Sequence, residues 1–300
     1  MNDELVRGDM PTYQTTRIRD GLAFGESPRW RDGRLWFSDF YRHGVFTIAP
    51  DGSDEQLVFE VPGQPSGLAW LPDGDQLCVS MTDHLVLRVG PTGTTVHANI
   101  SDYCGFWAND LTVSASGVAY VGNFGFDLDD VIARVGIEGL FASPPPTTNL
   151  VVLGPDGSTR QVVAEMAFPN GAVITPDGST LIIAETMAGR LSAFSIADDG
   201  TLHDRRLWAE LEFAAPDGIC LDAEGQVWYA NAATNACQRV REGGAVTATA
   251  TTTQTAFACA LGGEDRSTLF VMTAPTSSRF HVADARLGAI ESVLVDVPGV

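Results

Sequence analysis

The sequence is poor in basic residues and lacks long apolar runs. Only 18 Lys and Arg residues stand against 38 Asp and Glu, which gives a formal net charge of −20. Nucleic acids and anionic membranes attract basic faces, so this balance argues against both as partners. The acid excess is typical of a solvated surface that aids solubility. No apolar run approaches the roughly 18 residues that a membrane helix needs, so we expect no membrane span.

Cysteine is also scarce. The five cysteines include no Cys-x-x-Cys pair, which disfavours a thiolate zinc site, and the five histidines show no metal-ligand spacing. The odd number of cysteines and the polar, acidic start at Met1–Leu5 fit a cytoplasmic protein better than a secreted one. The chain contains neither a Gly-x-Ser-x-Gly elbow nor a glycine loop of the phosphate-binding type.

The chain does contain a repeated sequence motif that is rich in β-forming residues. Its clearest copy, at residues 168–186, has a polar residue followed by glycine, a short apolar run, a Pro-Asp-Gly-Ser turn and a second apolar run. Two such runs joined by an Asp-Gly turn predict a hairpin. The residues at the start of successive copies are Glu26, Ser66, Asn109, Asn170, Asp217 and Phe257. Their separations of 40, 43, 61, 47 and 40 residues are typical of propeller blades with four strands each.

We therefore predict an all-β fold, a six-bladed β-propeller of four-stranded antiparallel blades around a central channel. Residues 1–300 would form a single domain, since closed all-β folds often reach this length. Residues 1–24 lack a repeat of their own, so we expect Tyr13–Leu22 to supply a closing strand to the blade that ends near Val295. The longest separation holds an insertion at 127–148, which is interpreted either as a lid over one face or as a surface excursion without a role.

Pseudo-sixfold symmetry would bring the first residue of every repeat to the mouth of one channel. Glu26, Asn109, Asn170 and Asp217 offer hard oxygen atoms, and such a set suits Ca²⁺ best, although Mg²⁺, Mn²⁺ and Zn²⁺ also bind carboxylates. Each residue has an alternative interpretation. Asn170 and Asp217 precede glycine and are candidates for turn residues, Glu26 for a surface acid, and Asn109 for a turn cap.

The chain resembles the gluconolactonase family that includes senescence marker protein (regucalcin) and luciferin-regenerating enzyme. The segments that carry this resemblance are Gly25-Glu26-Ser27-Pro28-Arg29-Trp30, Asn109-Asp110, the phrase from Pro169 to Thr186, and Pro216-Asp217-Gly218. The resemblance implies a six-bladed propeller with one divalent ion held by Glu26, Asn170 and Asp217. It places Asn109 beside the ion, as a ligand or a substrate anchor.

One position departs from the family pattern. Sugar-lactone hydrolases of this group usually carry arginine two residues before the Asn of the Asn-Asp pair, and this chain has Trp107 there. With Phe106 beside it and Phe257 at the sixth repeat position, Trp107 favours an apolar or aromatic ring over a sugar, ordinary blade packing being the alternative. Asp127, near an acidic substrate contact of the family, and Ser66 complete the predicted substrate-binding residues.

Together these residues favour a metal-dependent hydrolase that opens a lactone, with Asp217 as the base that activates water. Two alternatives stay open. One is another metal-dependent enzyme on the same scaffold, such as a phosphotriesterase, an isomerase or a retro-aldol lyase. The other is a non-catalytic calcium-binding propeller. We expect a small-molecule substrate and a monomer or weak homo-oligomer.

Overall fold

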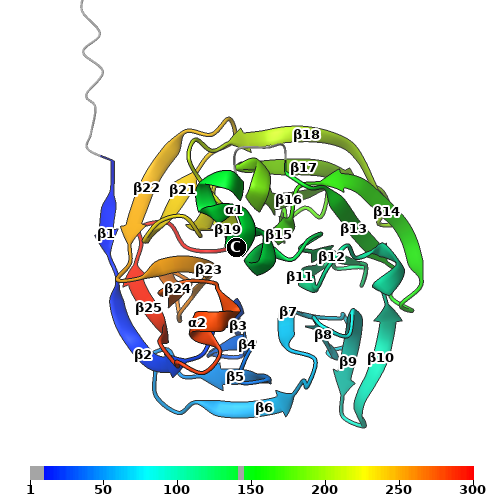
Figure 1. Ribbon diagram of the computed structural model, residues 1–300, viewed down its shortest axis with the longest axis horizontal. Coiled ribbons are helices and arrows are strands. Elements are labelled where there is room, and N and C mark those ends of the chain that lie inside the picture. The colour runs from blue at the N-terminus through cyan, green and yellow to red at the C-terminus, as the bar shows by residue number, and fades with distance from the viewer. Residues whose placement is uncertain (1–9, 141–144) are drawn as a thin grey trace, which may run out of the picture.

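The computed structural model describes residues 10–140 and 145–300, whose strands form six sheets around a central axis (Figure 1). The first blade consists of β3 (Gly25–Arg31), β4 (Arg34–Asp39), β5 (Gly44–Ile48) and β6 (Gln56–Glu60). The second consists of β7 (Pro65–Trp70), β8 (Gln76–Ser80), β9 (Leu85–Gly90) and β10 (Gly93–Asn99). The third consists of β11 (Ala108–Val113), β12 (Ala119–Asn123), β13 (Thr148–Leu153) and β14 (Thr159–Met166).

The second half of the ring repeats this pattern. The fourth blade consists of β15 (Pro169–Ile174), β16 (Thr180–Glu185), β17 (Arg190–Ile196) and β18 (Leu202–Glu210). The fifth contains β19 (Pro216–Leu221), β20 (Val227–Asn231), β21 (Ala236–Val240) and β22 (Val246–Thr251). The sixth contains β23 (Thr255–Gly262), β24 (Thr268–Ala274) and β25 (Gly288–Leu294). The prediction of a six-bladed propeller with four-stranded antiparallel blades is confirmed.

The amino-terminal segment joins two blades. Strand β2 (Thr16–Leu22) pairs antiparallel with β25 and is the fourth strand of the sixth blade. Strand β1 (Thr12–Gln14) pairs parallel with β22 and lengthens the fifth blade, a pairing that the repeat pattern does not indicate. The Tyr13 hydroxyl also donates a hydrogen bond to Asp296 at 2.9 Å. The segment therefore ties the fifth blade to the sixth.

The core lies between neighbouring blades. In β16, Leu181 and Ile183 pack against the third blade, whereas Ile182 and Ala184 on the opposite face pack toward the fifth blade. All four side chains are buried. A strand with both faces buried reads as a continuous apolar run, because successive side chains point to opposite faces. This is why the second run of each repeat lacks polar alternation.

Glycine behind the first residue of a repeat allows the innermost strands to approach one another. A Cβ atom at Gly171 would lie 2.6 Å from the backbone nitrogen of Ile219, and one at Gly218 would lie 2.7 Å from Cα of Ala258. Any larger residue would push neighbouring blades apart. The innermost strands contact each other around the whole ring, from β3 through β7, β11, β15 and β19 to β23 and back to β3.

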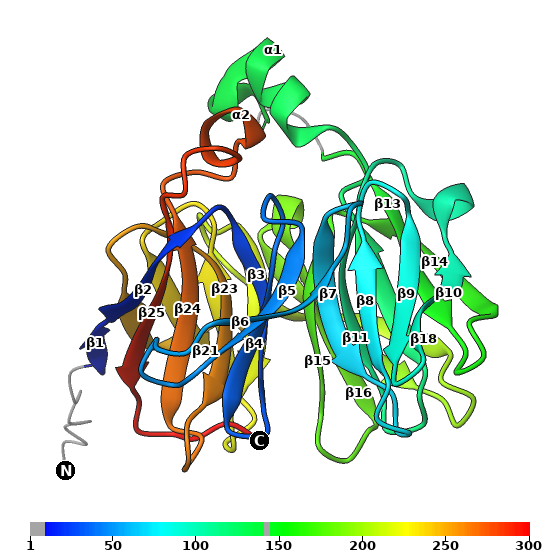
Figure 2. The ribbon, with the colours of Figure 1, turned by 90° about the horizontal axis from the view of Figure 1, so that it is seen from below.

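Two helices stand over one end of the channel (Figure 2). Helix α1 (Leu128–Leu140) belongs to the insertion in the third blade, and the short α2 (Arg279–Val282) lies between β24 and β25. Gly136, with φ of 73°, interrupts α1. The repeat pattern predicts the insertion but not its helical structure. Within the described residues, neither these nor other helices have the length and apolarity to cross a membrane. We refer to α1 and α2 together as the cap.

Candidate functional site

A pocket of about 100 Å³ lies at the cap end of the channel. The residues predicted to meet there that do line it are Glu26, Trp107, Asn109, Asp127, Asn170, Asp217 and Phe257. Ser66 is fully buried and does not line the pocket. The ring thus brings together residues that are far apart in the sequence.

A backbone irregularity accompanies each of these first-repeat positions. The pairing register of every innermost strand shifts there, as between Glu26 and Arg29 in β3 or between Pro216 and Ile219 in β19. The same shift occurs in β7, β11, β15 and β23. Such bulges end regular pairing and redirect side chains, and they are common next to active sites. Because the bulge recurs in all six innermost strands, each strand directs the side chain of its first repeat residue in the same manner at the channel.

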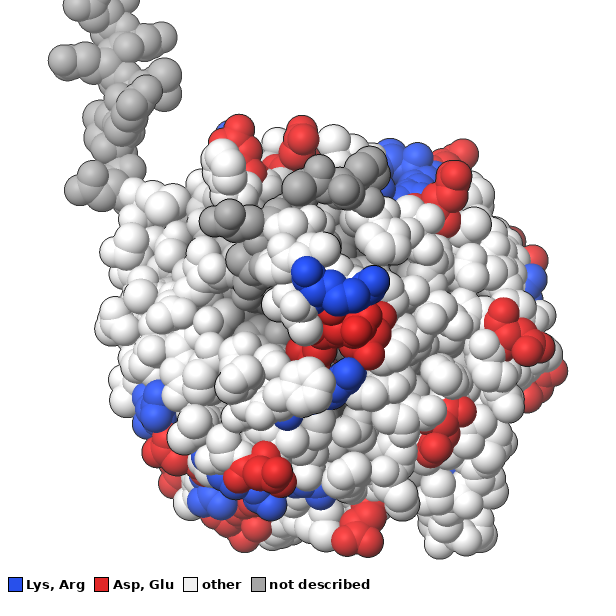
Figure 3. All heavy atoms as spheres, viewed as in Figure 1, with Lys and Arg blue, Asp and Glu red and all other residues white. Residues whose placement is uncertain are grey.

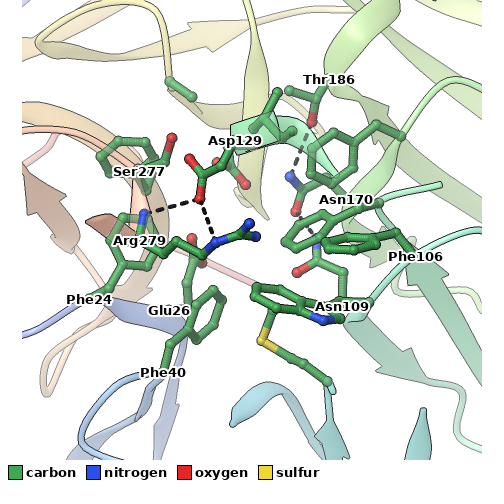
Figure 4. A pocket seen from close by; sticks show the side chains of 18 of the residues that line it. Phe24, Glu26, Phe40, Phe106, Asn109, Asp129, Asn170, Thr186, Ser277 and Arg279 are labelled. Carbon is green, nitrogen blue, oxygen red and sulfur yellow. Dashed lines mark hydrogen bonds and ion pairs between the residues drawn. The ribbon is translucent and has the colours of Figure 1, made fainter. Parts of the chain in front are cut away.

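A chain of hydrogen bonds orients the two amides. The Ser66 hydroxyl donates to Oδ1 of Asn109 at 3.1 Å, and Nδ2 of Asn109 donates to Oδ1 of Asn170 at 3.0 Å. Nδ2 of Asn170 donates to the Thr186 hydroxyl at 3.1 Å (Figure 4). The Thr186 hydroxyl in turn donates to the carbonyl of Pro216 at 2.8 Å. Ser66 therefore lies behind Asn109 and holds it, rather than at the surface where a substrate would make contact. Thr186 plays the same part for Asn170.

Three buried acids lie close to one another in the channel. Burial raises the pKa of Glu26 well above its ordinary value, and the charges of Asp217 and Asp110 add to this effect. Burial and the charge of Asp110 likewise raise the pKa of Asp217. Asp110 is partly compensated, because Arg29 and a hydrogen bond from the Ser27 hydroxyl counteract the increase that burial causes in its pKa. The channel thus concentrates negative charge that its own cations do not balance.

The pocket wall is aromatic. Phe106 stacks on Trp107 with ring centroids 4.8 Å apart, and Phe257 packs against Phe24 at 4.9 Å. The remaining aromatic residues of the lining are Phe40, Tyr41, Phe124 and Phe168. Such a wall offers apolar area and ring faces to a ligand. The carboxylates and amides lie at the floor, and further charged groups lie at the cap.

The cap contributes a charged cluster that the sequence did not reveal. Arg279 donates two hydrogen bonds to the carboxylate of Asp127, at 3.1 and 3.0 Å, and its backbone N–H donates to Asp129 at 3.1 Å. Its guanidinium lies 5.4 Å from the ring centre of Trp107. Charged atoms of both signs adjoin near the centre of this face, within a largely uncharged surface (Figure 3). Arg279 thus joins the sixth blade to the insertion of the third, directly above the aromatic wall.

The structure therefore adds Asp110, Thr186 and Arg279 to the predicted site. It places Ser66, a predicted substrate-binding residue, behind Asn109 and outside the pocket lining. Asp110 directly follows Asn109 in the sequence, and this Asn-Asp pair is its only signal there. Thr186 and Arg279 carry no local signal, because their roles depend on partners brought together by the ring. Asp127 lines the pocket, but its carboxylate is bound by Arg279.

Comparison with known proteins agrees with this architecture. A family model described as SMP-30/Gluconolactonase/LRE-like region matches residues 24–275. The fold is similar to that of regucalcin, a calcium-binding protein from Agrobacterium tumefaciens strain C58, with a TM-score of 0.76, 20% identity and 97% of each chain covered. A luciferin-regenerating enzyme matches with a TM-score of 0.77 and 16% identity over 95% of this chain and 97% of that one. A gluconolactonase from Xanthomonas campestris matches with a TM-score of 0.71 and 22% identity over 95% and 89% of the two chains. At these identities the similarity to the solved structures shows the fold alone.

Proposed function

The chain belongs to the SMP-30/gluconolactonase/LRE-like family, and from that premise we propose that it is a metal-dependent lactone hydrolase that prefers apolar or aromatic rings. The observation that carries this proposal is the convergence of Glu26, Asn109, Asn170 and Asp217 on the floor of an aromatic pocket. A polar floor beneath an apolar wall is the usual composition of a small-molecule site.

The chemistry of the floor fits a divalent cation. Among the described residues, no three His, Cys, Asp or Glu side chains form a metal-binding group, so amide oxygens would have to complete the ligand set. Glu26 and Asp217 repel each other in a buried site, and a dication would relieve that repulsion. Carboxylate and amide oxygens are the ligands that Ca²⁺ prefers, so we assign the ion to Glu26, Asn170 and Asp217, with Asn109 beside them. When bound, such an ion would polarise the ester carbonyl and stabilise negative charge on its oxygen.

The protein's own groups would move the proton and hold the ring. Asp217 takes a proton from the attacking water and returns it to the ring oxygen as the ester bond breaks, so that the product is a hydroxy acid. Burial raises the pKa of Asp217, so the carboxylate is a stronger base for the water proton than an exposed aspartate. Asn109, oriented by Ser66 and Asn170, directs the substrate. Trp107 and Phe257 select the ring type.

The cap controls how a substrate enters the pocket. The pocket volume of about 100 Å³ is below the roughly 300–1,000 Å³ of typical ligand sites, so a ring-sized substrate requires the cap to move. The pair between Arg279 and Asp127 joins the two parts of the cap, and it is partly exposed on both sides. Opening would break two hydrogen bonds in a place where water can replace them. We therefore assign the role of a lid to the described part of the insertion, which excludes residues 141–144.

The test is the Asp217→Asn variant, which keeps the shape of the side chain but cannot accept the proton. Hydrolysis of dihydrocoumarin, an aromatic lactone, is measured with a pH indicator in the presence of Ca²⁺, Mn²⁺ or Zn²⁺. We expect the variant to lower kcat by about 10³-fold, the usual size of a general acid–base contribution. Asp177→Asn is the matched control, because Asp177 caps an exposed hairpin turn and accepts from the backbone of Ser179 at 3.1 Å.

Two results would contradict the proposal. If Asp217→Asn keeps the activity of Asp177→Asn, Asp217 is not the base. If glucono-δ-lactone is hydrolysed with a higher kcat/KM than dihydrocoumarin, the aromatic wall does not select the ring. Failure of all lactones in the presence of each ion would remove the hydrolase assignment itself.

A further inference from the structure

A second cavity, of about 280 Å³, lies among residues of the innermost strands away from the acidic floor. Its lining includes Trp30 from β3, Val113 from β11, Ile174 from β15 and the carboxyl-terminal Val300. Figure 2 shows the carboxyl end of the chain at the face of the ring opposite the cap. None of the groups assigned above to lactone hydrolysis lines this cavity, so it needs a separate explanation.

Two cysteines stand side by side in this cavity. Sγ of Cys220, in β19, lies 3.7 Å from Sγ of Cys259, in β23, and both residues contribute to the lining. Cys220 is partly exposed, whereas Cys259 is 1% exposed. A small molecule in the cavity therefore meets Cys220 first, with Cys259 directly behind it.

The backbones of the two strands approach each other closely beside these cysteines. Two residues before Cys220, a Cβ atom at Gly218 would lie 2.7 Å from Cα of Ala258, the neighbour of Cys259. Sγ of Cys259 also lies 3.5 Å from the carbonyl oxygen of Gly218. A disulfide requires Cα atoms within about 7 Å, and the close contact of these strands together with the Sγ–Sγ distance of 3.7 Å favours that geometry.

We propose that Cys220 and Cys259 form a thiol–disulfide exchange site that reacts with low-molecular-weight disulfides entering the second cavity. Cys220 loses its proton as its sulfur attacks one sulfur of the small disulfide, which forms a mixed disulfide and releases one small thiolate. The thiolate of Cys259 then attacks Sγ of Cys220, forms the protein disulfide and releases the second small thiolate. Two protons leave the cysteines and two small thiols result, so the small disulfide is reduced as the protein is oxidised.

The bond would connect the innermost strands of the fifth and sixth blades. These are the same two blades that β1 and β2 already join at their outer edges. The cysteines are 39 residues apart, so the bond closes a long loop of the unfolded chain. Loops of this length give a clear stabilisation when the native geometry is not strained. Oxidation would therefore raise the melting temperature.

The experiment uses the full-length protein and 2-hydroxyethyl disulfide, whose halves are small enough for the cavity. After incubation, free thiols are alkylated under denaturing conditions and the protein is mapped by mass spectrometry. We expect two of the five cysteines to escape alkylation and one linked pair of peptides to contain Cys220 and Cys259. The apparent melting temperature should rise by roughly 5 °C.

Single variants provide the controls. Cys220→Ser should lose both the link and the thermal shift, and Cys259→Ser should stop at the mixed disulfide on Cys220. Cys78→Ser and Cys104→Ser should behave as wild type, because these thiols lie in other blades. A link between Cys259 and Cys237, a mixed disulfide that never resolves in the wild type, or five alkylated cysteines would each overturn the proposal.

Discussion

Two regions of the propeller each bury a glutamate, and they surround it in opposite ways. Glu185, at the end of β16, receives hydrogen bonds from Arg190, Arg205 and Ser192. Burial alone would raise the pKa of Glu185, but these bonds lower it to about 2. The carboxylate of Glu26, at the channel, accepts a single hydrogen bond within the described part of the chain, from the backbone of Ser27, and its pKa is raised.

This difference in surroundings distinguishes a residue that stabilises the fold, Glu185, from a residue of the candidate site, Glu26. An acid that is buried and fully hydrogen-bonded contributes to stability, because removing it leaves its donors without partners. An acid that is buried among other acids lowers stability, and such groups concentrate at functional sites. Glu185 and Glu26 are the same residue type and both are buried, so the groups around them, donors in one case and acids in the other, distinguish their roles. Three predictions test this distinction, beginning with the largest effect.

The first prediction compares Glu185→Gln with Glu26→Gln in the absence of added divalent ions. Glu185→Gln should lower the free energy of unfolding by about 3 kcal/mol, because two arginines lose their carboxylate. Glu26→Gln should leave it unchanged or raise it by about 1 kcal/mol, since it removes repulsion with Asp217. Urea denaturation measures both. An equal loss in the two variants would show that Glu26 is a scaffold residue like Glu185.

The pH dependence provides the control for this comparison. The lowered pKa of Glu185 means that its stabilisation is complete above the ordinary value of 4.5 and is lost as the pH falls toward about 2. The raised pKa values of Glu26 and Asp217 give a pH dependence of stability in the opposite direction. Their repulsion destabilises the fold at high pH and disappears as the pH falls through the raised values. Glu26→Gln should flatten this second change and leave the first intact.

The second prediction concerns the divalent ion. If the channel acids hold Ca²⁺, the ion should stabilise the wild type by about 2.7 kcal/mol at a free concentration of 100 times its dissociation constant. The double variant Glu26→Gln/Asp217→Asn should lose this effect, and Glu185→Gln should keep it. Thermal denaturation with Ca²⁺ or with a chelator measures the difference. The same stabilisation in the double variant would place the ion elsewhere in the molecule.

The channel residues could be predicted from the sequence because, in a ring of similar blades, residues at the same position of each repeat lie at the same end of the channel. Glu26, Asn109, Asn170 and Asp217 share one phase of the repeat and one backbone irregularity, so finding the phase locates the floor. The same reasoning could not distinguish Ser66 from the residues that line the pocket, because Ser66 shares their position in the repeat but lies behind Asn109. In that blade the neighbouring amide, and not the repeat, determines what the side chain contacts.

Features that lie outside the repeat were beyond such reasoning. Arg279 and Asp127 are 152 residues apart and lie in the long connections between the second and third strands of the sixth and third blades, which are short in the other four blades. Helix α1 lies in the connection between the second and third strands of its blade, which in the first, second, fourth and fifth blades spans only residues 40–43, 81–84, 186–189 and 232–235, so these blades gave no template for it. Strand β1 is three residues long and pairs with a blade other than the one its neighbour joins. The pKa difference between Glu185 and Glu26 likewise depends on arginines placed by tertiary structure.

The third and smallest prediction concerns the cap, where a charged pair serves neither the scaffold nor the floor. Arg279→Ala removes the bidentate bond to Asp127 and the contact with Trp107, so a bound aromatic lactone would be covered less well. We expect KM to rise about tenfold, which corresponds to about 1.4 kcal/mol, with kcat within about threefold of wild type.

Arg134→Ala is the matched control for this prediction, because Arg134 forms an exposed pair with Asp130 on the same helix at 3.0 Å and does not line the pocket. Both variants should unfold at nearly the wild-type urea concentration, since partly exposed ion pairs contribute at most about 1 kcal/mol. A fall in kcat with unchanged KM would instead mean that Arg279 acts on the reacting ester. The cap would then belong with the channel acids, as part of the chemistry, and not with the entrance.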